Sequence, residues 1–200
     1  MSGTFPTSPA PNSVEIQSLE PNLVSVTQNL KRQVRSRGGQ RWSLKVSFPP
    51  LTRSEFAPIY AFAIAQKGQF ETFTFTPPVV SVSQGDTSES PVVNGALAVG
   101  VNTASLDGLT ASKSYIIRAG DFFKFSGHSK VYMATADLHS DSSNAGTLTF
   151  APNLQSSVAN NETITFASVP FVCSFTTDIT SFNTDTSNLY ALNFELVEIF

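Results

Sequence analysis

Short apolar runs separated by clusters of turn residues fill most of the chain, and this pattern constrains the fold more than any other feature. In residues 41–48, Trp42, Leu44 and Val46 alternate with polar residues, which gives a strand one apolar face and one polar face. The 200 residues include 40% hydrophobic residues and 17 Phe, enough to bury a core. The sequence therefore predicts a mainly β protein.

One segment departs from this pattern and predicts a helix over residues 53–66. Thr52 and Glu55 have the spacing of a capping box, with Thr52 as the N-cap. Four residues then recur on one helical face: Phe56, Ile59, Tyr60 and Ala63. Gly68 ends the segment, and we expect no other helix of any length.

Two turns are predicted before this helix. Glu20-Pro21-Asn22 divides residues 14–27 into two strand pieces. Gly38-Gly39 can take the positive φ angles of a tight hairpin turn, so residues 30–37 and 41–48 are expected to pair with each other.

The order of strands predicts an inserted domain after Pro77-Pro78. Five short apolar runs follow at a spacing typical of a small Greek-key barrel of the OB type: 96–101, 114–117, 122–125, 131–136 and 148–150. Long strands return in 170–176 and 189–200, and these need partners built earlier in the chain. We therefore expect residues 1–77 and 168–200 to form a β-sandwich with one helix, residues 1–13 being an extended arm, and residues 78–167 to form the inserted OB-type β-barrel.

The composition argues against a metal, a cofactor and catalysis. Two His and one Cys leave few ligands for a transition metal, and the glycine fingerprints of phosphate binding are missing. A glycosidase needs two carboxylates across a cleft. Asp121 with Asp137 or Asp141 is the only compact acidic grouping, and Asp121 is more simply a turn residue. No apolar run approaches 18 residues and no signal peptide is visible, so we expect no membrane insertion and synthesis in a cytoplasm.

Charge is distributed unevenly along the chain. Six of the 12 basic residues lie close together: Lys31, Arg32, Arg35, Arg37, Arg41 and Lys45. No Lys or Arg follows Lys130, whereas acidic residues such as Asp178, Asp185 and Glu195 do. The basic cluster fits a solvated face, a nucleic-acid contact or a subunit contact. We favour the subunit contact, because complementary patches on one chain join head to tail and generate rings or filaments. In this interpretation Lys31, Arg32, Arg35, Arg37 and Arg41 of one copy meet Asp178, Asp185 and Glu195 of the next.

The segment from Ala119 to Tyr132, which contains Gly120-Asp121-Phe122, resembles the inserted OB domain of distal tail proteins of long-tailed bacteriophages, in particular the T-five-like siphophages. The order of elements is also similar to that family, with a strand-rich start, a helix after Phe-Pro-Pro and two C-terminal strands. The resemblance implies a structural virion protein of the tail, not an enzyme, forming a hexameric ring that joins the tail tube to the tip or baseplate complex. It implies tail tube and tail tip or baseplate hub proteins as partners, with DNA passing through the lumen without sequence-specific binding.

A carbohydrate-binding module that recognises the host surface is the alternative from another class. OB barrels can present aromatic residues to oligosaccharides. Tyr115 and Tyr132 could supply such contacts, together with Phe122 and Phe123. The simpler interpretation places these four rings in the barrel core, because they lie within predicted strands.

Overall fold

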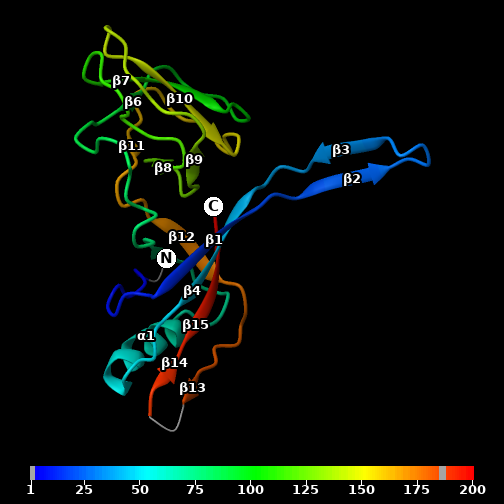
Figure 1. Cartoon of the computed structure of the whole chain (residues 1–200), viewed down its shortest axis with the longest axis vertical. Helices are drawn as coiled ribbons and strands as arrows, with labels where there is room; N and C mark the ends of the chain where they lie inside the picture. The colour runs from blue at the N-terminus through cyan, green and yellow to red at the C-terminus, as the bar shows by residue number, and fades with distance from the viewer. Residues whose placement is uncertain (1–2, 185–187) are drawn as a thin grey trace. The chain divides into compact units, whose positions relative to one another are not determined.

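The computed structural model describes residues 3–184 and 188–200, and the chain divides into two compact units. The barrel unit comprises Met1–Pro6, Glu71–Cys173 and Ile199–Phe200, and the sheet unit comprises Thr7–Phe70 and Ser174–Glu198. Among the described residues α1 is the one α-helix and the other elements are strands (Figure 1). The predicted mainly β fold with one helix is therefore confirmed. The prediction that residues 78–167 form a domain inserted between residues 1–77 and 168–200 stays a prediction.

Three antiparallel strands organise the sheet unit: β1 (Ser13–Leu19), β4 (Arg41–Ser47) and β15 (Asn193–Glu198). Central β4 pairs with β1 along one edge and with β15 along the other, so Leu44 stands opposite both Ile16 and Leu196. The apolar face predicted for β4 is confirmed, because Trp42, Leu44 and Val46 are all buried. The short strands β13 (Asn183–Thr184) and β14 (Tyr190–Ala191) pair separately.

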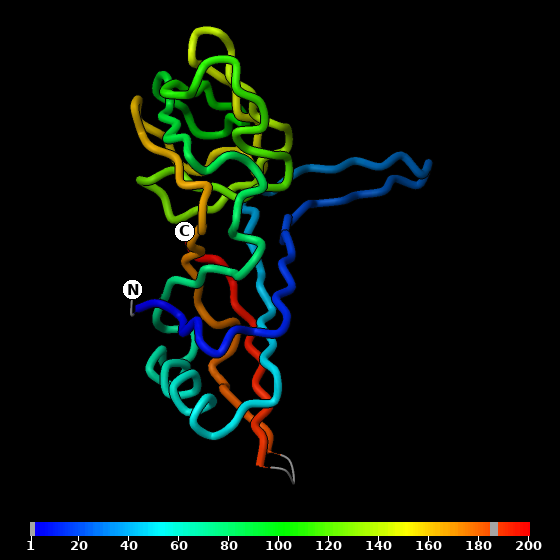
Figure 2. Tube along the Cα trace, turned by 60° about the vertical axis from the view of Figure 1, so that its left-hand side comes forward, coloured from blue at the N-terminus to red at the C-terminus, as the bar shows by residue number. Residues whose placement is uncertain are grey.

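Helix α1 (Arg53–Ala65) lies beside these strands and begins as predicted (Figures 1 and 2). The Glu55 carboxylate accepts hydrogen bonds from the Thr52 N–H and hydroxyl at 2.9 and 2.7 Å, and these bonds lower the pKa of Glu55. Phe56 is buried on the apolar face of the helix and stacks on Tyr190, with the ring centroids 4.4 Å apart. The helix therefore contributes aromatic surface to the core of the sheet unit.

The predicted division of residues 14–27 into two strand pieces at Glu20-Pro21-Asn22 is confirmed, because β1 ends at Leu19 and the next strand begins at Asn22. The predicted hairpin turn at Gly38-Gly39 was wrong. Strand β2 (Asn22–Val26) pairs with β3 (Arg32–Ser36), so the hairpin turns at residues 27–31 and not at Gly38-Gly39. Leu19 pairs with Arg41 and Asn22 pairs with Ser36, which leaves four residues, 37–40, opposite the two residues 20–21. Gly38 and Gly39, with φ of 68° and 71°, accommodate this bulge. Positive φ angles serve a bulge as well as a hairpin turn.

Six strands form a barrel-like sheet in the barrel unit: β6 (Val92–Val93), β7 (Thr103–Asp107), β8 (Phe122–Phe125), β9 (Tyr132–Ala134), β10 (Gly146–Ala151) and β11 (Ile164–Thr165). Their order is β11-β8-β9-β10-β7-β6. An isolated bridge from Val92 to Thr163 connects the two ends of this order, so the barrel is nearly closed.

Two predicted barrel strands, 96–101 and 114–117, contain only isolated bridges. Gly100 and Tyr115 take positive φ angles of 92° and 58°, which interrupt an extended strand. The predicted runs 122–125, 131–136 and 148–150 overlap β8, β9 and β10, whereas β6, β7 and β11 were not predicted.

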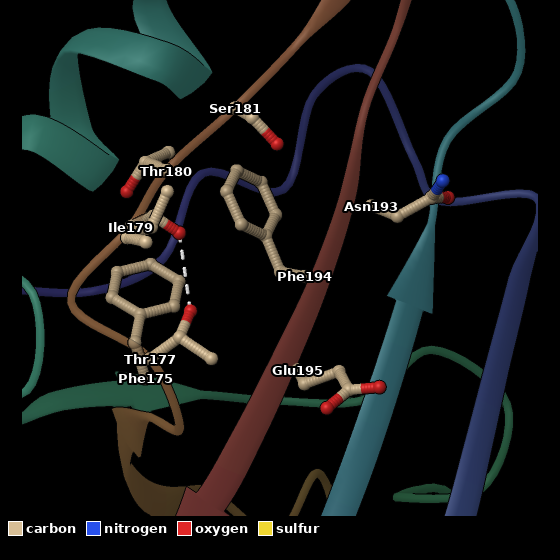
Figure 3. A pocket seen from close by; sticks show the side chains of 8 residues that line it. All are labelled: Phe175, Thr177, Ile179, Thr180, Ser181, Asn193, Phe194 and Glu195. Atoms are coloured by element: carbon tan, nitrogen blue, oxygen red, sulfur yellow. Dashed lines mark hydrogen bonds between the residues drawn. The ribbon is translucent and has the colours of Figure 1, made fainter.

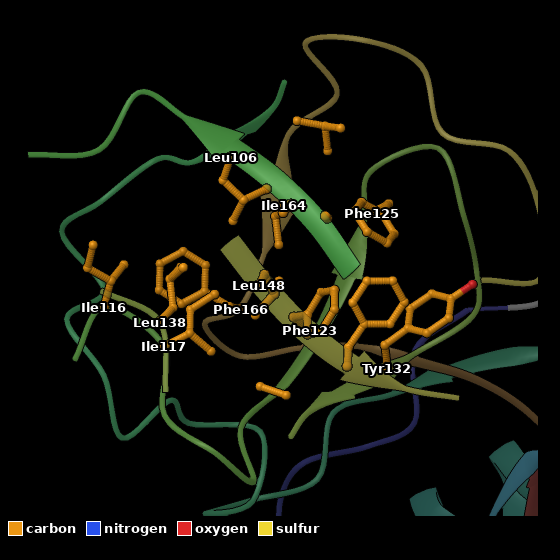
Figure 4. Close-up of a cluster of buried hydrophobic side chains, with 14 of the residues drawn as sticks. Leu106, Ile116, Ile117, Phe123, Phe125, Tyr132, Leu138, Leu148, Ile164 and Phe166 are labelled. Carbon is orange, nitrogen blue, oxygen red and sulfur yellow. The ribbon is translucent and has the colours of Figure 1, made fainter. Parts of the chain in front are cut away.

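The barrel core is aromatic and aliphatic (Figure 4). Phe123, Phe125 and Tyr132 point into it, together with aliphatic residues such as Leu106 and Leu148. Phe123 and Tyr132 lie 5.8 Å apart between ring centroids, in stacked geometry. These rings supply much of the buried surface that stabilises the barrel.

Two further strands, β5 (Phe73–Phe75) and β12 (Phe171–Phe175), pair antiparallel. Phe5 packs on Phe73 and Phe75, with centroid distances of 5.8 and 5.4 Å. Its N–H also donates to the Thr74 carbonyl at 2.8 Å. Part of the segment predicted as an extended arm is therefore anchored in a core.

In the described part of the chain, no helix has the length and hydropathy needed to cross a bilayer.

Candidate functional site

A two-stranded arm, residues 20–39, projects from the paired strands β1 and β4 (Figures 1 and 2). Every residue of this arm is exposed. Its large apolar side chains are between 51% and 84% exposed: Leu23, Val24, Val26, Leu30 and Val34. A two-stranded ribbon is marginally stable in water unless something packs on it, and contiguous exposed apolar surface usually marks an interaction site. The arm therefore has the surface of a docking element.

The register of the arm mixes aliphatic and cationic side chains on both faces. Val24 stands opposite Val34, and Val26 opposite Arg32, on one face. Leu23 stands opposite Arg35 on the other face. Each face can thus bury aliphatic surface while its guanidinium groups meet acceptors on a partner.

The five basic residues predicted as a subunit interface all lie on the arm or at its base, and all are exposed. They are Lys31 beside the turn, Arg32 and Arg35 on β3, Arg37 in the bulge, and Arg41 at the start of β4. Arg41 also lines a hollow of about 520 Å³ with Leu19 and Pro21. Within residues 3–184 and 188–200, Lys31, Arg32, Arg35 and Arg37 form no salt bridge. The structure therefore brings the predicted basic residues together, although not through the predicted hairpin.

Two of the predicted acidic residues, Asp178 and Glu195, lie in the sheet unit, and the third, Asp185, lies outside the described residues. Asp178 is exposed, but its Oδ1 accepts the Gln69 N–H at 3.1 Å just after helix α1. Glu195 is exposed on β15 and stands opposite Lys45 of β4. Asp178 therefore already accepts a hydrogen bond within its own chain, and Glu195 already stands opposite a cationic residue, Lys45, of its own chain.

A pocket of about 200 Å³ lies between β15 and residues 177–181 (Figure 3). Phe175 and Phe194 line it with aromatic surface, their ring centroids 5.3 Å apart. The Thr177 hydroxyl donates to the Ile179 carbonyl at 3.1 Å and holds the rim. Glu195 lines the same pocket, whose rim also carries the highly exposed Ile179. Apolar and acidic groups therefore occur together here, the complement of the apolar and basic arm.

The barrel aromatics do not form the predicted carbohydrate platform. Tyr132 is fully buried and its hydroxyl accepts the Gln155 N–H at 3.1 Å, so the prediction of a sugar contact at Tyr132 was wrong. Phe122 and Phe123 are buried as well. Tyr115 is 47% exposed, but the Arg118 guanidinium lies 4.6 Å from its ring centroid. Phe123 and Tyr132 belong to the barrel core, whereas Phe122 packs on Phe171 with the ring centroids 5.4 Å apart, so Tyr115 has no neighbouring exposed ring among these four.

The three candidate carboxylates of the barrel each hold a turn. Asp121 is buried and accepts hydrogen bonds from the Ser83 hydroxyl at 2.6 Å and the Arg118 N–H at 3.1 Å. Asp137 accepts the Ala119 N–H at 2.9 Å, and Asp141 accepts N–H groups within its own turn. These roles fit the interpretation of Asp121 as a turn residue. Among the described residues, no group of three or more His, Cys, Asp or Glu could hold a metal ion.

An ion-pair cluster that was not predicted from the sequence holds the chain segment that leads into the first barrel strand, β6. The Lys113 ammonium lies 2.7 Å from Asp86 and 2.6 Å from Glu89. Hydrogen bonds from Lys113 lower the pKa of both carboxyl groups, and those carboxylates raise the pKa of Lys113. No sequence spacing signals this cluster, because its members lie 24 and 27 residues apart.

The uncovered apolar surface of the arm is a feature of a protein that assembles with other chains. Residues 80–169, a little under half of the chain, match the family model described as distal tail protein pb9, B domain. A comparison with curated proteins gives no match. The family match supports a phage distal tail protein, and with it a structural role in a phage tail as a component of the virion.

Proposed function

We propose that the chain forms a closed hexameric ring at the distal end of the tail and joins the tail tube to the tip or baseplate complex. The family match supports the tail, and the uncovered arm is the observation that carries the assembly. Tail tube and hub proteins are the expected neighbours, and DNA passes through the lumen without base readout.

The arm is the element that reaches a neighbouring copy. Its Leu23, Val24 and Val34 side chains are about half exposed, and a neighbour's surface would remove them from water. The acceptor surface combines the pocket beside β15 with Asp178 and Glu195. The arm and the acceptor are different surfaces of one chain, so the contact between copies is head to tail. Repeating this contact gives a closed ring only if the rotation from copy to copy completes a circle.

Aliphatic side chains on both faces of the arm favour a protein partner over nucleic acid. Phosphate contacts use Lys and Arg, whereas Val24, Val26 and Val34 add apolar surface beside Arg32. A subunit interface uses both kinds of group, with apolar residues at its centre and charges at its rim.

Charge reversal on the arm tests this proposal. The variant carries Arg35→Glu and Arg37→Glu, and the control carries Arg53→Glu and Lys67→Glu, which change the net charge equally at exposed positions of the α1 region. Light-scattering mass across a salt series should show that wild type and control assemble and that assembly weakens with salt, because exposed charges are screened over about 8 Å at physiological ionic strength. The arm variant should be a folded monomer. An arm variant that assembles as wild type does would contradict the proposed contact.

A further inference from the structure

Leu30 stands at the tip of the arm, in the turn that joins β2 and β3. Its side chain is 84% exposed, more than any other large apolar side chain among the described residues. Its φ of 59° lies in the left-handed region, which glycine and asparagine adopt readily and a bulky residue rarely does. A leucine at this position is thus unfavourable for the single chain in two ways, and burial against another surface would remove the exposure.

The turn that carries Leu30 is held by hydrogen bonds of its own. The Leu30 N–H donates to the Thr27 carbonyl at 2.8 Å, and the Thr27 N–H donates to the Lys31 carbonyl at 3.1 Å. The Thr27 hydroxyl donates to the same Lys31 carbonyl at 3.3 Å. The backbone is therefore fixed on both sides of Leu30, and a side chain presented by a fixed turn loses less entropy on binding.

The pocket of about 200 Å³ beside β15 has the size and the lining for such a side chain (Figure 3). Phe175 and Phe194 line it with aromatic surface, and Ile179, which is 81% exposed, stands at its rim. An apolar cavity of about 150 Å³ holds one benzene molecule. The pocket therefore has room for one aliphatic side chain.

The charges beside the tip and beside the pocket are of opposite sign. Lys31 follows Leu30 directly and is exposed, and Glu195 is exposed and lines the pocket. Neither residue forms a salt bridge within the part of the chain that the structure describes. A leucine in the pocket brings the residue after it to the rim, where Lys31 and Glu195 attract each other.

The register of the sheet separates the arm from the pocket of its own chain. The arm begins beyond the pair Leu19 and Arg41 at one end of β4, whereas Asn193 of the pocket pairs with Ser47 at the other end (Figures 1 and 2). Ser47 lies six residues along β4 from Arg41, about 20 Å at roughly 3.4 Å per residue. The pocket that accepts an arm tip therefore belongs to another copy.

We propose that Leu30 of one copy is the anchor of the contact between copies and fills the pocket beside β15 of the next copy. The inference rests on the proposed function, and it adds the side chain that fixes the register of one copy on the next. Burial of Leu30 removes apolar surface from water. Because a tip enters a pocket and not another tip, the contact has one direction.

Three single variants of the full chain test the anchor by light scattering over a range of concentrations. Leu30→Asn suits the left-handed backbone but removes the apolar side chain, so it should keep the unfolding temperature of the wild type and raise the concentration needed for assembly about tenfold or more. Leu30→Met keeps an apolar side chain and should assemble as wild type does. Val99→Asn, the matched control at a side chain of the barrel unit that is 62% exposed, should also assemble as wild type does.

A cross-link tests where the tip binds. Leu30→Cys and Ser181→Cys chains, each carrying one substitution, are mixed at a concentration at which the wild type assembles and are treated with a mild oxidant. Ser181 is exposed and lines the pocket, and the native Cys173 is buried. A covalent pair of chains that a reductant separates is expected. Leu30→Cys mixed with Val99→Cys should give no such pair.

The inference is overturned if Leu30→Asn assembles as wild type does or if no cross-link to position 181 forms. If the reversal of Arg35 and Arg37 to Glu still blocks assembly in that case, the arm contact of the proposed function stands and the anchor alone is wrong. If neither change affects assembly, or if the wild type stays monomeric, the anchor and the proposed arm contact are both wrong.

Discussion

Replacing Leu44 by Ala should destabilise the sheet unit strongly. Leu44 is 0% exposed at the middle of β4, opposite Ile16 on one side and Leu196 on the other. The substitution removes three carbon atoms, worth about 2.4 kcal/mol at roughly 0.8 kcal/mol per buried CH₂. Strands on both edges hold the backbone, so the cavity cannot collapse fully, and a total loss of about 3–4 kcal/mol is expected within the known range of about 2–5.

Trp42 makes this measurement direct, because it is the only Trp of the chain and lies on the same strand. Its fluorescence in a urea titration reports the unfolding of the sheet unit, with the m-value expected to stay unchanged. The matched control is Leu23→Ala on the arm, the same chemical change at a side chain that is 54% exposed. The control should change the free energy of unfolding by less than about 0.5 kcal/mol. Equal effects of the two substitutions would refute the assignment of core and arm.

Three further predictions concern local features. Gly68→Ala should cost more stability than Gly39→Ala. Both residues have positive φ, 66° and 71°, but only at Gly68 would the new Cβ meet a neighbouring loop, at 2.7 Å. Equal shifts in unfolding temperature for the two variants would count against this close approach. Lys113→Met should lower the unfolding temperature of the barrel by a constant amount at neutral pH. The difference between wild type and variant should shrink as the pH falls below about 4, because the pKa of Asp86 is lowered in the fold and the stabilisation by its ion pair is lost when Asp86 is protonated. A difference that does not depend on pH would argue against the ion pair. An excised segment 79–167 should unfold cooperatively in calorimetry, and a broad, non-cooperative melt would show that the barrel needs the rest of the chain.

Local patterns predicted the elements whose formation depends on neighbours in sequence. The capping box at Thr52 and the alternation around Leu44 are such signals, and the structure contains both. Gly38-Gly39 failed as a hairpin signal, because positive φ angles also suit a bulge, and the choice depends on the register between β1 and β4. Tyr132 failed as a surface residue, because closure of the barrel decides which face of β9 is buried.

The candidate interface was predicted in part. Clustering of Lys and Arg in sequence located the basic residues on one element, since residues 31–37 follow one another along the arm. The apolar character of the arm was overlooked, although Leu23, Val24 and Val34 were visible in the sequence. A strand pattern indicates an apolar face, but whether anything covers that face depends on the rest of the fold.

The mass and shape of the purified chain test the assembly most directly. Light scattering combined with negative-stain images should show annular particles of six copies for the wild type. A variant with Val24→Asp and Val34→Asp, which replaces the facing valine pair of the arm by carboxylates, should be a monomer with the unfolding temperature of the wild type. A wild type that stays monomeric at every concentration, or an arm variant that still forms rings, would contradict assembly through the arm.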